Sequence, residues 1–99
     1  MDINSLMAQA TELKLRINSA QKNLEKVVVK GLSDNGDVII EMSGKYKILN
    51  LTINERLLSQ DKHSIEQIII DAFNDAKDKA DKVIDEMMES ATTGIQMPE

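Results

Sequence analysis

The sequence predicts an α+β fold in which a long helix, a three-stranded antiparallel meander and a second long helix follow one another in a single domain, residues 1–99. Three observations support this prediction: heptad-like spacing of apolar residues near the start, alternating apolar residues in the middle, and helical spacing again in the last third. A chain of 99 residues with no repeat or linker has room for one such unit with a thin core. We assign 3–26 to the first helix, 27–54 to the sheet, 62–90 to the second helix and 91–99 to a flexible tail.

The first helix is predicted by apolar residues spaced alternately three and four apart, with no Gly or Pro between them. Such a seam is typical of paired helices, and its alanines indicate a closely approaching neighbour. That neighbour belongs either to a second copy, which gives a homodimer, or to the same subunit. The seam comprises Ile3, Leu6, Ala10, Leu13, Ile17, Ala20, Leu24 and Val27, with Leu6, Leu13, Ile17 and Leu24 as the candidates for dimer or core contacts.

The middle of the chain alternates apolar and polar residues, as strands with one buried face do. The pair Asn35-Gly36 predicts a type I′ turn in the first hairpin, because both residues tolerate positive φ. A second tight turn is expected at 43–45. The apolar residues predicted to share a face are Val38, Ile40 and Met42 in the second strand and Leu49, Leu51 and Ile53 in the third.

The second helix begins after a polar stretch, with either Asp61 or Ser64 as its N-cap; Ser64 and Gln67 match a capping box. Its outward side carries the i,i+4 pairs Asp75 with Lys79 and Asp78 with Lys82, and Gly94 and Pro98 mark a tail that cannot continue the helix. Its apolar side comprises Ile65, Ile68, Ile69, Ala72, Phe73, Ala76, Ala80, Val83, Ile84 and Met87.

Charge is unevenly distributed along the chain, whose net charge is -5. Residues 1–26 carry four bases and three acids, residues 27–60 carry four of each, and residues 61–99 carry four bases and ten acids. A surface that contacts nucleic acid would therefore use the first helix and the strands and avoid most of the second helix.

Several segments, taken in order, resemble those of the YbaB/EbfC family. They include Met7-Ala8-Gln9-Ala10 in the first helix, Gly36 and Gly44 in the hairpins, the run LTINERLLSQDK, and AFNDAKDKADKVIDEMM at 72–88. The closing residues 93–98 are also similar in kind and position. The likeness covers essentially the whole chain and rests on order, spacing and length together.

The resemblance implies a homodimer whose long helices project from a joined sheet region, and which binds duplex DNA with little sequence specificity, shapes the nucleoid and influences gene expression. The alternative is a small acidic dimeric interaction module, a chaperone or adaptor, that does not bind DNA directly. The net charge of -5 suits that alternative.

The best candidates for phosphate contact are basic residues on the polar face of the first helix, because lysine and arginine bind phosphate without reading bases. For each residue the competing explanation is an ordinary solvated helix face. The candidates are Lys14, Arg16 and Lys22, followed by a weaker group around the strands formed by Lys26, Lys30, Lys45, Lys47 and Arg56.

Other functional classes find little support in the sequence. The carboxylates of 71–89 alternate with lysines, which is typical of a solvated surface, and His63 has no second histidine or cysteine for metal binding. No nucleophile elbow or phosphate loop is present, so we expect no catalytic residues, cofactor or enzyme activity. The absence of cysteine and of a long apolar run favours a cytoplasmic protein with no membrane partner. The family resemblance implies that the protein is located on the nucleoid.

Overall fold

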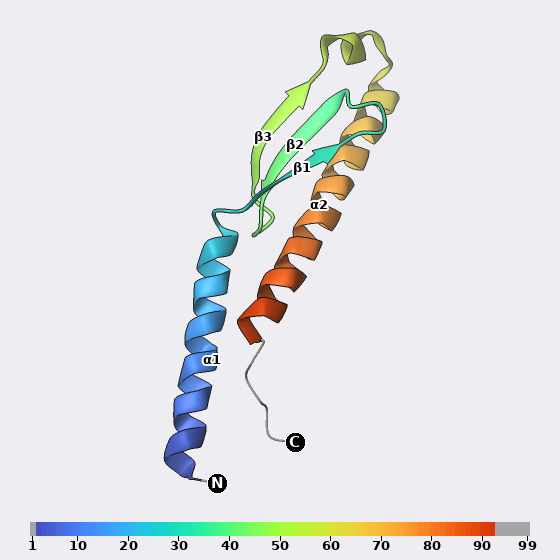
Figure 1. Cartoon of the computed structure of the whole chain (residues 1–99). Coiled ribbons are helices and arrows are strands. Elements are labelled where there is room, and N and C mark those ends of the chain that lie inside the picture. The colour runs from blue at the N-terminus through green and yellow to red at the C-terminus, as the bar shows by residue number, and fades with distance from the viewer. Residues whose placement is uncertain (1, 93–99) are drawn as a thin grey trace.

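The computed structural model describes residues 2–92 and confirms the α+β architecture of two long helices and a three-stranded antiparallel sheet (Figure 1). Residues 91 and 92 extend the second helix, and the rest of the tail predicted at 91–99 lies outside the described residues. The elements are α1 (Ile3–Leu24), β1 (Val28–Leu32), β2 (Val38–Ser43), β3 (Ile48–Ile53), the 3-10 helix η1 (Glu55–Ser59) and α2 (Lys62–Thr92).

The chain is elongated, with extents of 68 × 23 × 16 Å. The first half of α2 lies along one face of the sheet, and its second half continues beyond the sheet beside α1, which runs in the opposite direction (Figure 1). The two helices contact each other through the end of α1, where Ala20 and Leu24 are buried. Both helices therefore project from the same end of the sheet.

Short polar side chains begin both helices. The carboxylate of Asp2 accepts a hydrogen bond from the backbone N–H of Asn4 (3.2 Å). At the start of α2, Asp61 accepts from both the backbone N–H (3.2 Å) and the hydroxyl (2.6 Å) of Ser64. Asp61 is thus the N-cap, and Ser64 is the third helical residue, where an N-cap side chain finds its donor.

The strands pair in the order β1-β2-β3, with a register shift between Glu41 and Met42. Val38, Ile40 and Met42 form one buried face of β2, as predicted, and they pack against α2. β3 differs, because α2 covers β1 and β2 and leaves all six residues of β3 exposed.

Small residues let α2 approach the sheet closely. Ala72, Ala76 and Ala80 are fully buried, and the first two face Gly31 of β1. A Cβ atom on Gly31 would lie 2.3 Å from the carbonyl oxygen of Ala72 and 2.5 Å from the Cβ of Ala76. The helix backbone therefore occupies the space of a missing side chain.

The first hairpin does not have the type I′ turn predicted from Asn35-Gly36. Of these two residues only Gly36 has positive φ (74°), and its N–H donates to the carbonyl of Ser33 (2.9 Å). The connection spans the five residues 33–37, and the Asn35 side chain accepts hydrogen bonds from the Ser33 hydroxyl and the Asp37 N–H (both 3.1 Å). This side chain stabilises the longer loop, which removes the need for a two-residue turn.

In the second turn, residues 43–47, Gly44 is needed because a side chain would not fit there, and not because its backbone has positive φ. The left-handed residue is Tyr46 (φ 67°), whereas a Cβ on Gly44 would lie 2.7 Å from the carbonyl oxygen of Leu24 at the end of α1. Ser43 organises the turn, because its hydroxyl accepts from the N–H groups of Lys45 and Lys47 (both 3.2 Å).

We predict that Gly31→Ala lowers the free energy of unfolding by about 3 kcal/mol, because the new methyl group meets the α2 backbone and cannot be relieved by a side-chain rotation. Gly36→Ala is the control: it meets open space and costs only the strain of positive φ, about 1 kcal/mol. Urea denaturation followed by circular dichroism measures both values. Equal midpoints for Gly31→Ala and the parent chain would contradict the close approach of α2.

Candidate nucleic-acid interface

The end of α1 and the β2–β3 turn meet and bring basic side chains together. The N–H of Gly44 donates to the carbonyls of Leu24 (3.0 Å) and Val27 (3.1 Å), and the Lys45 ammonium pairs with Glu25 (3.1 Å). These contacts juxtapose two segments that are about twenty residues apart in the sequence. We call the basic residues of this region the junction cluster, which comprises Lys22, Lys26, Lys45 and Lys47.

Lysines without an ion pair concentrate in the first half of the chain. In α2, three lysines pair with carboxylates of the same helix: Lys62 with Glu66 (3.8 Å), Lys77 with Asp81 (3.2 Å) and Lys79 with Asp75 (2.9 Å). Within residues 2–92 the lysines that make no ion pair are Lys14, Lys22, Lys26, Lys30, Lys47 and, from α2, Lys82.

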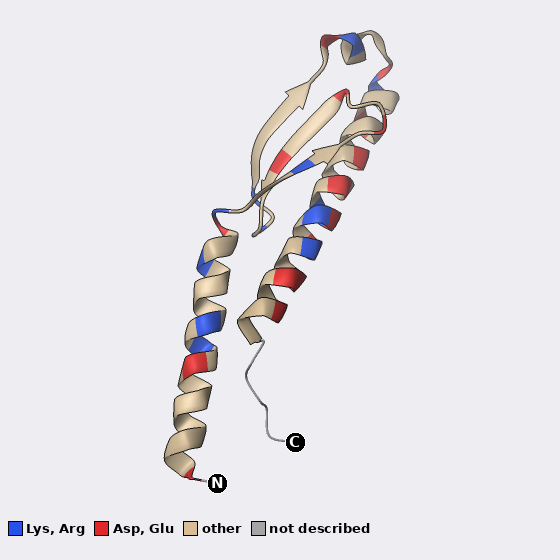
Figure 2. Cartoon of the chain, viewed as in Figure 1, with Lys and Arg blue, Asp and Glu red and all other residues tan. Residues whose placement is uncertain are grey.

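This distribution separates two electrostatic surfaces. Figure 2 shows mostly lysine and arginine along α1 and at its junction with the sheet, whereas along α2 carboxylates outnumber the lysines among them. Free ammonium groups attract phosphate, and carboxylates repel it. The junction cluster and the outward side of α1 are therefore the surfaces suited to a polyanion.

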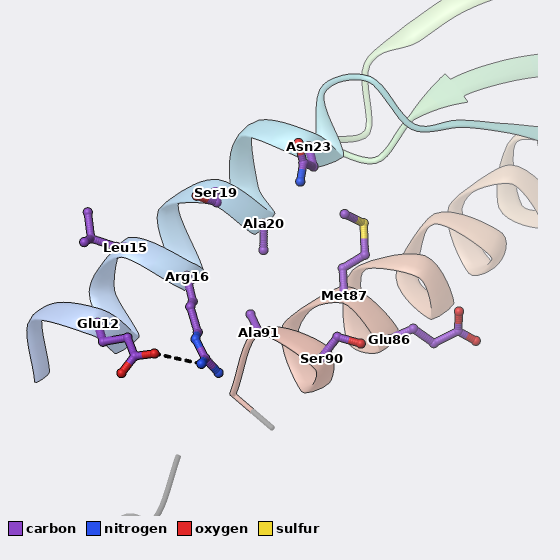
Figure 3. Close-up of a pocket in the computed structure, with 10 residues that line it drawn as sticks. All are labelled: Glu12, Leu15, Arg16, Ser19, Ala20, Asn23, Glu86, Met87, Ser90 and Ala91. Atoms are coloured by element: carbon purple, nitrogen blue, oxygen red, sulfur yellow. Dashed lines mark hydrogen bonds and ion pairs between the residues drawn. The ribbon is translucent and has the colours of Figure 1, made fainter. Parts of the chain in front are cut away.

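The other predicted contact residues occupy different positions. Lys14 is exposed on α1, and Lys30 lies on β1 opposite Glu41 of β2. Arg16 pairs with Glu12 one turn away (2.8 Å), and its side chain extends toward α2 (Figure 3). Arg56 pairs with Asp37 (2.5 Å), whose side chain is only 3% exposed, so Arg56 neutralises a buried carboxylate.

A groove of about 770 Å³ runs between α1 and α2 (Figure 3). Its lining is mixed in character, and Met87 and Ala91 of α2 point toward α1. Of the predicted helix seam, Leu24 is buried beside the groove, whereas Leu6, Leu13 and Ile17 are only half-buried. The lining residues are Glu12, Leu15, Arg16, Ser19, Ala20, Asn23, Glu86, Met87, Ser90 and Ala91.

The predicted pair of Asp75 with Lys79 is confirmed, and two α2 carboxylates make tertiary contacts that the sequence did not predict. The Asp75 carboxylate accepts from the backbone N–H of Leu32 in β1 (2.9 Å) as well as from Lys79, and these two contacts lower the pKa of Asp75. Lys79 also donates to the carbonyl of Lys30 (2.7 Å). The predicted pair of Asp78 and Lys82 does not form, whereas Lys77 and Asp81 pair instead.

Asp81 also accepts a hydrogen bond from the Tyr46 hydroxyl, which links the β2–β3 turn to α2. This hydrogen bond, together with desolvation and the charges of Asp81 and Asp85, raises the pKa of the Tyr46 phenol. The pKa of Asp81 is lowered by the same hydrogen bond and by Lys77. Sequence reasoning missed this contact, because no local pattern relates residues 46 and 81.

The fold and the lysine cluster define a small α+β protein with a surface suited to polyanion binding. Comparison with known proteins identifies its family: the model of the YbaB/EbfC DNA-binding family matches residues 1–95. The chain belongs to this family, which is a family of DNA-binding proteins and not of enzymes.

Curated relatives are of similar length and share a common designation. Proteins named nucleoid-associated protein from Methylocella silvestris and Anaeromyxobacter dehalogenans are 35% and 36% identical, covering 98% and 99% of this chain and 92% and 96% of their own lengths. One from Legionella pneumophila is 34% identical, covering 99% of this chain and 91% of the relative.

The fold also occurs in a crystal structure of an uncharacterised protein from Helicobacter pylori. That structure has a TM-score of 0.78 and 19% identity, and the match covers 91% of this chain and 96% of the other. In the part of the chain that the structure describes, neither helix combines the length and apolarity needed to cross a membrane.

We predict that the Tyr46 phenol titrates above the ordinary tyrosine pKa of about 10. The hydrogen bond to Asp81 therefore stabilises the fold fully below that pH and is lost as pH rises through the higher pKa of the folded state. At acid pH the contribution of Asp81 is present above its unfolded pKa and is lost as pH falls through its lowered folded pKa.

Alkaline titration followed by ultraviolet absorbance measures this pKa directly, because Tyr46 is the only tyrosine and the chain has no tryptophan. Asp81→Ala should return the titration to the ordinary range, whereas Asp78→Ala, on the same helix and without this contact, should leave it unchanged. An ordinary tyrosine titration in the parent chain would contradict the hydrogen bond.

Proposed function

We propose that this protein is a nucleoid-associated protein that binds duplex DNA with little sequence specificity, shapes DNA conformation and thereby influences gene expression. The observation that carries the proposal is the concentration of lysines without ion pairs between residues 14 and 47, combined with membership of a DNA-binding family. The relatives named nucleoid-associated proteins support the same role in the cytoplasm, on the nucleoid.

The junction cluster is the centre of the proposed DNA surface. Lys22, Lys26 and Lys47 present free ammonium groups from two segments, and Lys45 can exchange Glu25 for a phosphate. Lys14 extends the surface along α1, a helix of about 33 Å, which is comparable with one turn of duplex DNA at roughly 34 Å. Such contacts read the backbone and not the bases, which explains low sequence specificity.

We predict that binding to duplexes of unrelated sequence has similar affinity and weakens steeply as salt rises, because lysine contacts release counterions from phosphate. Lys22→Gln with Lys26→Gln should weaken binding and reduce the slope of log affinity against log salt by about 0.9 for each phosphate contact removed. Fluorescence anisotropy with labelled duplexes measures both quantities.

The charge-matched control is Lys62→Gln with Lys82→Gln, which removes two lysines from α2 and should leave the slope unchanged. Equal effects of the two double variants would contradict the proposed surface. A parent chain that does not bind DNA at any salt concentration, but recovers one protein from a nuclease-treated extract, would support the adaptor alternative.

We also propose that the functional unit is a homodimer joined through the sheet. The nine buried apolar residues within 2–92 include four alanines, so one chain buries little large apolar surface. Ile40 of β2 is 2% exposed, whereas its cross-strand neighbour Leu51 of β3 is 47% exposed. Residues exposed on and beside β3 are Ile48, Leu49, Leu51, Ile53 and Phe73.

A second copy accounts for this surface better than solvent does, because exposed apolar patches of this kind are rare on monomers. Phe73 lies one turn before Lys77 on the same side of α2, and the Lys77 ammonium lies 5.8 Å from the Tyr46 ring centroid at the β2–β3 turn. Phe73 is therefore on the side of α2 that carries the contact with this turn. A dimer also doubles the junction cluster, which lets an acidic chain present a usable basic surface.

We predict that the parent chain sediments with twice the mass of one chain and that Leu51→Lys shifts it toward the monomer, because a charged side chain would be buried in the interface. The control is Leu58→Lys: Leu58 is 69% exposed and lies on η1, outside the strand. Sedimentation velocity over a range of concentrations measures the mass. A monomeric parent chain at high concentration would refute the dimer.

A further inference from the structure

The β2–β3 turn contacts both helices that project from the sheet. On the α1 side, Gly44 donates its N–H to the carbonyls of Leu24 and Val27, and its lack of a side chain permits this approach. The Lys45 ammonium adds an ion pair with Glu25 (3.1 Å). The end of α1 is thus fastened to the turn through backbone and side-chain contacts.

On the α2 side, the same turn is held by Tyr46 alone among the described residues. Its hydroxyl donates to the Asp81 carboxylate, and its ring lies beneath the Lys77 ammonium, which itself pairs with Asp81 (3.2 Å). Tyr46, Lys77 and Asp81 form a closed three-residue cluster. The β2–β3 turn lies at the end of the sheet beyond which α2 continues beside α1 (Figure 1).

The backbone conformation of Tyr46 is unusual for a residue with a side chain. Its φ of 67° is in the left-handed region, which a residue with a Cβ atom adopts only when its surroundings require it. Gly44, two residues earlier, has an ordinary φ. The left-handed position directs the Tyr46 side chain to α2 while Lys45 and Lys47, on either side, belong to the junction cluster.

We propose that Tyr46 is a positioning residue that fixes the distance between α1 and α2, and with it the distance of the α2 carboxylates from the junction lysines, by clamping the β2–β3 turn to α2. This inference rests on the proposed DNA-binding function. In the absence of the clamp, α2 would stay packed on β1 through Ala72 and Ala76, and its second half would contact α1 only through the lining of the groove. The carboxylates of this half would then move relative to the junction cluster, whose lysines stay joined through the Gly44 hydrogen bonds and the Lys45–Glu25 pair.

The helix spacing can be measured directly, because the chain contains no cysteine. Spin labels at Gln9→Cys on α1 and Ser90→Cys on α2, in protein diluted with excess unlabelled chain, report the intrachain distance by pulsed electron resonance. The parent chain should give a narrow distribution. Tyr46→Phe and Asp81→Ala should each widen it, and the double variant should be no wider than Asp81→Ala alone, because both substitutions remove the same hydrogen bond between Tyr46 and Asp81.

The matched control is Ser59→Ala, which also removes one exposed hydroxyl group. The Ser59 hydroxyl donates a hydrogen bond to the Arg56 carbonyl (2.9 Å) within η1 and makes no contact with the clamp. It should leave the distance distribution unchanged. Circular dichroism of each variant verifies that the fold is retained. If Tyr46→Phe or Asp81→Ala gives the parent distribution in a folded protein, the clamp is refuted.

DNA binding gives the second measurement. Tyr46→Phe should lower duplex affinity about three- to tenfold, the value of one lost hydrogen bond, while the slope against salt stays that of the parent because no lysine is removed. Widened distances with unchanged affinity would refute the positioning role. A parent chain that fails to bind DNA refutes the proposed function, whereas the distance measurement still tests the clamp by itself.

Discussion

The arrangement of the whole chain depends on the close approach of α2 to β1. Gly31 leaves space for the helix backbone, and three buried alanines at four-residue spacing keep the contact surface flat along the helix. Larger side chains would lift α2 away from the sheet and separate Asp75 from the Leu32 N–H, as well as Asp81 from Tyr46. The same contact therefore determines the packing of the core and the position of the helical half that projects beyond the sheet.

Much of the fold could be predicted from the spacing of apolar residues, because a helix or strand with one apolar face has a characteristic spacing within its own sequence. The turns were less predictable. Asn35 was expected to adopt positive φ, yet its side chain accepts hydrogen bonds within the loop and only Gly36 is left-handed. In the second turn the left-handed residue is Tyr46 and not Gly44, and this could not be predicted because the helix end that crowds Gly44 and the carboxylate that binds Tyr46 are distant in sequence.

The basic surface was predictable as a region but not residue by residue. The charge of successive thirds of the chain located the lysines between residues 14 and 47, and an i,i+4 spacing already related Arg16 to Glu12. Tertiary neighbours decide the rest. Arg56 neutralises buried Asp37, and Lys45 meets Glu25 from twenty residues away, whereas Lys26 and Lys47 retain free ammonium groups.

The contacts that α2 makes with β1 have a consequence for assembly. The outward N–H of Leu32 and the outward carbonyl of Lys30 are already bonded to Asp75 and Lys79, so another strand cannot add there without displacing both side chains. Extension of the sheet is confined to its β3 side. When only the β3 edge can pair with another strand, two copies can join symmetrically through their β3 strands. The resulting dimer has no free β3 edge to which a third copy could add. Edge protection on β1 thus favours a closed pair over an open-ended fibre.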